Sequence, residues 1–121
     1  MTKQVEVVGN YRYVLNTKTD DQIYNTNVTN PDGRDRTRGS DLYAHKGKNG
    51  NIIFYLLEWS RWQGEYDTLE VVSKFQAENF LIERTKNDPW GFPYNKDDEE
   101  MLKKYDLNIM EEGEVVEVIE A

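Results

Sequence analysis

The stretch that most restricts the fold of this chain is residues 52–62, IIFYLLEWSRW, where large apolar or aromatic side chains fill eight of eleven positions. In an extended chain, alternate side chains point to opposite faces. Both faces of such a strand are apolar here, so we expect a central strand that is covered at least in part on each side. The alternation breaks after Glu58, and Trp59, Arg61 and Trp62 then lead to a strand end where a binding surface can form. Burial is the favoured prediction for Trp59, whereas the sequence does not distinguish a buried from an exposed Trp62.

A hairpin accounts for the start of this strand. The strands expected at 41–45 and 51–59 flank the connection 46–50, in which Asn49-Gly50 is a favoured hairpin-turn pair. Alternating or β-branched segments predict further short strands at 4–8, 11–15, 23–24, 66–72, 107–110 and 115–119. Residues 4–8 and 11–15 are either a tight hairpin at Gly9-Asn10 or one bent strand.

Two helices complete the expected fold. Ser73 and Gln76 match a capping box, followed by an apolar stripe at helical spacing as far as about Lys86. Residues 97–105 carry acids in the first turn and lysines in the last, which suits the helix dipole. The prediction is an α+β fold in a small single domain, residues 1–121, with a mostly antiparallel twisted sheet of about five strands and one or two helices packed on one face.

The residue content restricts the chemistry. The chain has no cysteine and one histidine, His45, which is too few ligands for a zinc site. As a general base, His45 needs an orienting partner, and Asp41 lies on the same face of the same strand. No phosphate-binding glycine loop or HExxH motif occurs. We therefore expect no metal and no cofactor. A small enzyme is the least favoured of the functional hypotheses. No apolar run has the length of a signal peptide or membrane span, which favours a cytoplasmic protein.

The charge distribution supports the first functional hypothesis. The net charge is -8, and the acids are concentrated in the segment 97–121. An acidic surface opposes attraction to nucleic acid and favours basic partners. We expect a non-catalytic binding or regulatory protein that acts through a protein partner with a basic surface; by analogy of charge alone, this includes an inhibitor or accessory protein of a mobile element or phage. The expected interface residues are Trp62, Trp90, Phe92, Glu99, Glu100, Glu111 and Glu112. The simpler account of the acids is a solvated helix face and a protected strand edge.

An exposed polar loop at residues 25–40 supports the alternative hypothesis, a nucleic-acid-binding module. The loop has three arginines at alternate positions, which lie on one side when the chain is extended. Together with the neighbouring hairpin they predict one basic patch, beside aromatic side chains that can stack on bases; its residues are Arg34, Arg36, Arg38, His45, Lys46, Lys48 and Arg61. The simpler account is a solubilising loop whose arginines pair with neighbouring aspartates. The identity of a partner and the oligomeric state are left open.

Overall fold

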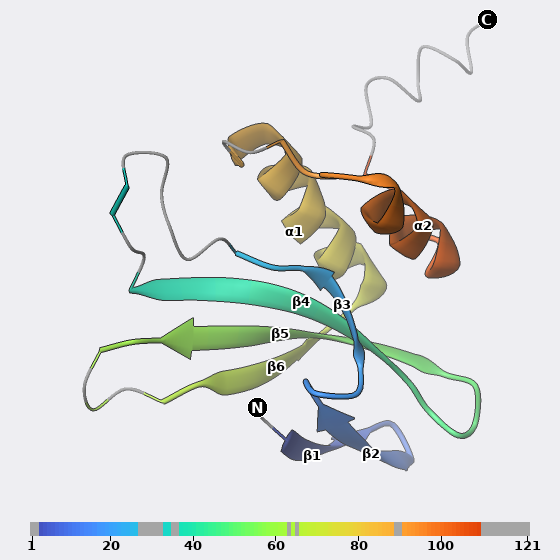
Figure 1. Ribbon diagram of the computed structural model, residues 1–121. Helices are drawn as coiled ribbons and strands as arrows, with labels where there is room; N and C mark the ends of the chain where they lie inside the picture. The colour runs from blue at the N-terminus through green and yellow to red at the C-terminus, as the bar shows by residue number, and fades with distance from the viewer. Residues whose placement is uncertain are drawn as a thin grey trace, which may run out of the picture. The chain divides into compact units, whose positions relative to one another are not determined.

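The computed structural model describes residues 3–26, 33–34, 37–62, 64, 66–88 and 91–109. Six strands and two helices occur in these residues, which confirms the α+β class (Figure 1). The chain divides into two compact units, residues 1–73 with the strands and residues 74–121 with the helices. The single-domain organisation and the packing of helices on a sheet face stay predictions. No helix in the described ranges has the length and apolar character needed to cross a membrane.

The larger sheet has four antiparallel strands in the order β3-β4-β5-β6 (Figure 1). Their bounds are Asp21–Tyr24 for β3, Arg38–Lys46 for β4, Ile52–Ser60 for β5 and Thr68–Val72 for β6. The apolar strand β5 is internal, as its two apolar faces predict. The β4–β5 hairpin is also confirmed: Gly50 has the positive φ of 86° that its turn requires. The Gly47 N–H donates to the Asn51 carbonyl at 2.8 Å.

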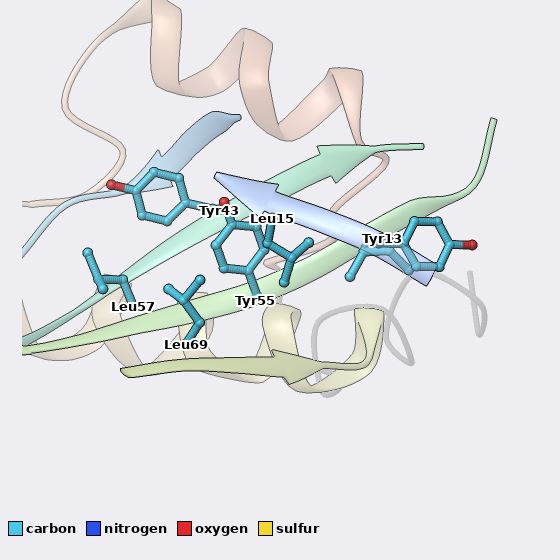
Figure 2. Packing of buried hydrophobic residues seen from close by; sticks show 7 residues of the cluster. Tyr13, Leu15, Tyr43, Tyr55, Leu57 and Leu69 are labelled. Carbon is cyan, nitrogen blue, oxygen red and sulfur yellow. The ribbon is translucent and has the colours of Figure 1, made fainter. Parts of the chain in front are cut away.

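A two-stranded sheet covers part of the larger one. Strands β1, Lys3–Val8, and β2, Tyr11–Asn16, form a tight hairpin, with Gly9 at a φ of 62° in the turn. The alternative of one bent strand is thereby excluded. The core cluster joins β2 to the larger sheet (Figure 2); it consists of Tyr13, Leu15, Tyr43, Ile53, Tyr55, Leu57 and Leu69. Since side chains alternate along a strand, the intervening Val14 is exposed.

The expected polar loop is shorter than predicted, because residues 38–40 belong to β4. At its other end, Thr26 is tied to the same strand. The Thr26 hydroxyl donates to the Ser40 carbonyl at 2.6 Å, and the Thr26 N–H donates to an Asp41 carboxylate oxygen at 2.9 Å. The backbone that follows β3 is therefore hydrogen-bonded to β4, although it is not part of the regular β-ladder between the two strands.

The helical unit contains α1, Lys74–Asn87, and α2, Lys96–Lys104. The predicted apolar stripe of α1 is partly confirmed, since Ala77 and Leu81 are buried. In α2 the acids of the first turn and the lysines of the last are also as predicted. The N-cap is Asn95, whose side-chain oxygen accepts the Asp98 N–H at 3.0 Å. This bond satisfies one of the N–H groups that the first helical turn leaves without a partner.

The strand predicted at 107–110 is wrong for its described residues, 107–109. The chain instead closes α2 in a Schellman motif. Asp106 has a positive φ of 53°, its N–H donates to the Lys103 carbonyl, and the Leu107 N–H donates to the Leu102 carbonyl at 2.9 Å. The Asn108 N–H donates to the Glu78 carboxylate at 2.7 Å. These N–H groups are thus used locally. The strand predicted at 115–119 lies outside the described residues.

Candidate functional site

The histidine has a different partner from the one predicted. His45 Nδ1 lies 2.8 Å from the Asp20 carboxylate, in the connection between β2 and β3. The expected partner, Asp41, is four residues away along β4, which is roughly 13 Å at the rise of a strand. Sharing a face therefore did not bring the two side chains into contact. No local pattern indicates Asp20, which lies 25 residues before His45.

Asp20 is the centre of a buried polar network. One carboxylate oxygen faces His45, and the other accepts the Tyr55 hydroxyl at 2.6 Å and the Asn16 N–H at 2.9 Å. The Asp20 side chain is 9% exposed. Burial, together with the nearby Asp20 carboxylate, raises the pKa of Tyr55, so its phenol stays protonated as a donor. Because both carboxylate oxygens are occupied, the network serves to hold the β2–β3 connection against β4 and β5.

Asp41, near the middle of β4, forms a second buried polar contact. Its carboxylate accepts the Thr26 N–H and, at 3.2 Å, the indole N–H of Trp59. Trp59 is partly buried against the core, as predicted. Its ring lies on Gly39, where an added Cβ would fall 2.3 Å from the ring. Glycine at this position is therefore needed for the contact between Trp59 and Asp41.

Replacing Asp41 with asparagine is expected to leave the protein at least as stable near neutral pH. Burial raises the pKa of Asp41, and Glu58 and Asp67 add to the effect. A raised pKa contributes stability below the ordinary value, and this is lost as the pH rises through the folded-state pKa. Asparagine keeps an acceptor for the Thr26 and Trp59 N–H groups without the charge.

The measurement is urea unfolding of both proteins between about pH 3 and about pH 7, a range that begins below the ordinary pKa of aspartate. The stability of the asparagine variant relative to the parent protein should increase with pH. A difference that stays constant across this range would contradict the assigned cause.

The predicted basic residues do not form one compact patch. Arg38 pairs with Ser60 at one end of the β4–β5 hairpin, and Lys46 pairs with Ile52 at the other. Nine residues of β4 separate these ends by roughly 26 Å. His45 and Lys48 lie near the Lys46 end. Arg34 is exposed, and Arg36 lies outside the described residues.

Three of the predicted residues, Arg38, Arg61 and Trp62, lie where β4 begins and β5 ends. The Arg61 N–H donates to the Thr37 carbonyl at 2.8 Å, which places Arg61 beside the start of β4. Trp62 follows and is 55% exposed, while Tyr66, before β6, is 86% exposed. We call this group the sheet-end surface; it consists of the exposed residues Arg38, Arg61, Trp62 and Tyr66.

Side-chain oxygens hold the backbone of the sheet-end surface. The Trp62 N–H donates to the Ser60 hydroxyl at 3.1 Å, and the Ser60 N–H donates to the Asp67 carboxylate at 3.2 Å. These two bonds hold the backbone at Ser60 and Trp62. Large exposed aromatic side chains such as Trp62 and Tyr66 are the type of residue that anchors interfaces.

The helical unit corrects one predicted interface residue. Phe92 is 4% exposed, and its ring contacts Tyr94 edge-to-face at 5.5 Å. Phe92 is therefore a packing residue and not an exposed anchor. Glu99 and Glu100 are exposed on α2. The other predicted residues, Trp90, Glu111 and Glu112, lie outside the described ranges.

Within the described ranges, no group of three or more His, Asp or Glu side chains is placed to hold a metal ion. The sheet-end surface combines exposed aromatic and cationic side chains, which are types that favour binding. No family model, curated protein or solved structure matches this chain.

Proposed function

We propose that this is a non-catalytic binding or regulatory protein that acts through a protein partner, and that the partner contacts the sheet-end surface. The observation that supports this is the exposure of Trp62 and Tyr66 beside backbone groups that hydrogen bonds hold, namely the N–H groups of Ser60 and Trp62. Tryptophan, tyrosine and arginine supply much of the energy at protein interfaces.

The proposal includes a partner with a basic surface and a cytoplasmic location. The net charge of -8 favours a basic partner. The exposed acids Glu99 and Glu100 of α2 are a second surface for such a partner, and Glu111 and Glu112 follow in the sequence. These acids steer association more than they add affinity, so the aromatic residues are the sharper test.

The test is quantitative capture of a partner from a lysate of the native host. The double variant Trp62→Ala/Tyr66→Ala should weaken binding by at least about tenfold, the loss that removal of one interface anchor typically causes. The matched control is Tyr11→Ala, because Tyr11 is another exposed aromatic residue of the strand unit, with 54% of its surface exposed. The thermal midpoint should stay near that of the parent protein. Capture that is unaffected by the double variant, or the failure to capture any partner, would contradict the proposal.

One observation favours the alternative, a nucleic-acid-binding module. Arg38 and Arg61 lie at the same sheet end as Trp62, so cationic and stacking groups occur together. Binding to an oligonucleotide should then weaken steeply with salt, and Arg38→Ala/Arg61→Ala should flatten that dependence. No retention on DNA or RNA at low salt would exclude this alternative.

A further inference from the structure

Strand β6 is an edge of the larger sheet (Figure 1). Within the described residues it pairs with β5 alone, in a continuous antiparallel register from Thr68 to Val72. An edge strand has an outer row of backbone N–H and C=O groups that can accept another strand. Thr68 and Glu70 are exposed along this edge, while Leu69 is buried in the core.

The opposite edge of the same sheet is less suited to strand addition. Strand β3 has only four residues, and its register with β4 shifts between Gln22 and Tyr24. Such irregularities interrupt the row of backbone groups and protect an edge from pairing. Strand β6 has no such interruption along its pairing with β5.

We propose that the β6 edge binds an extended, basic segment of the partner by strand addition, a mode of binding that rests on the proposed protein-binding function. Residues 66–72, YDTLEVV, contain Asp67 and Glu70 and no lysine or arginine. Both acids are exposed. In strand addition, main-chain hydrogen bonds supply affinity and alternate side chains supply specificity. A basic side chain on one face of the added strand pairs with the Glu70 carboxylate, whereas Asp67 precedes β6 and accepts the Ser60 N–H. Tyr66 flanks the end of the added strand.

A second copy of this chain fits the β6 edge less well. Glu70 is the middle residue of β6. Two-fold antiparallel pairing of two β6 strands about their centres therefore places the two Glu70 residues opposite each other. Like charges directly opposite each other across a strand pair are destabilising. This centred pairing of two β6 strands is therefore disfavoured, and a strand of opposite charge is favoured.

The experiment uses residue-resolved amide hydrogen exchange of the full chain, with and without a seven-residue peptide of alternating lysine and threonine. We expect alternate β6 amides, those on the outer side, to exchange at least about tenfold more slowly when the peptide is bound, because an added strand provides their acceptors. Glu70→Lys should weaken peptide binding by about tenfold or more. Glu83→Lys makes the same charge change at an exposed position of α1 that has no part in the proposed binding surfaces, and it should have little effect.

Three results would overturn the strand-addition proposal: no peptide binding, binding without protection of β6, or greater sensitivity to Glu83→Lys than to Glu70→Lys. Protection that increases with protein concentration, without peptide, would assign the edge to a second copy instead. Partner capture that depends on Trp62 and Tyr66 but not on Glu70 would preserve the proposed function and exclude the edge. If the peptide protects β6 but partner capture does not depend on Trp62 and Tyr66, the β6 edge is supported and the proposed aromatic surface is excluded.

Discussion

Truncation of Leu15 to alanine is expected to lower the free energy of unfolding by about 3 kcal/mol, within the range measured for buried leucines. Leu15 is fully buried in the cluster that joins β2 to the larger sheet (Figure 2). Its neighbours in the cluster include Tyr55, which is also fully buried and cannot move easily into the space. Urea unfolding followed by circular dichroism measures the loss, which is a large share of the stability of a typical domain.

The adjacent Val14 is the matched control, because it lies on the outer face of the same strand and is 43% exposed. Val14→Ala should cost less than about 1 kcal/mol, since much of its surface already contacts water. Equal losses from the two substitutions would show that the β1–β2 hairpin does not cover the core. The pair therefore tests the packing of the hairpin on the sheet.

Replacing Asp20 with alanine is the second substitution with a large expected effect, a loss of about 3 kcal/mol. The change leaves the Tyr55 hydroxyl, His45 Nδ1 and the Asn16 N–H without their acceptor. Donors that stay buried without an acceptor lose their hydrogen bonds to water on folding and gain nothing in return. Asp20→Asn keeps one acceptor oxygen and should cost less.

The control for Asp20 lies in the same connection. Lys18 has an exposed side chain, and the contact it makes with Asn16 is through its backbone N–H. Lys18→Ala should therefore change the urea midpoint little. If Asp20→Ala is no more destabilising than Lys18→Ala, the network contributes nothing measurable, and the Asp20–His45 contact is incidental to folding.

The site was only partly predictable. The break in alternation after Glu58 indicated a strand end, and Trp62 is exposed just beyond that end, where side chains no longer pack on the sheet. The prediction of a single basic patch failed because Arg38 and Lys46 are the first and last residues of the extended strand β4, at opposite ends of the β4–β5 hairpin. Phe92 failed because aromatic content alone does not distinguish a packed loop from an exposed one.

The features that depend on neighbouring residues were predictable from the sequence alone. The internal position of β5 follows from its two apolar faces, the β4–β5 turn from Asn49-Gly50, and the polarity of α2 from its terminal charges. Each of these rests on interactions over a few residues, where backbone geometry relates sequence spacing directly to direction. Local pattern and local structure agree in such cases.

The contacts between distant segments were not predictable and are known from the structure. Tyr13 accepts hydrogen bonds from the side chains of Asn49 and Asn51, which lie 36 and 38 residues away. Asp20 reaches His45 and Tyr55 in the same way, across strands that are paired by register and not by proximity in the chain. The partner of a polar side chain is set by which strands pack together, and this depends on burial of the whole apolar core. No local pattern contains that information.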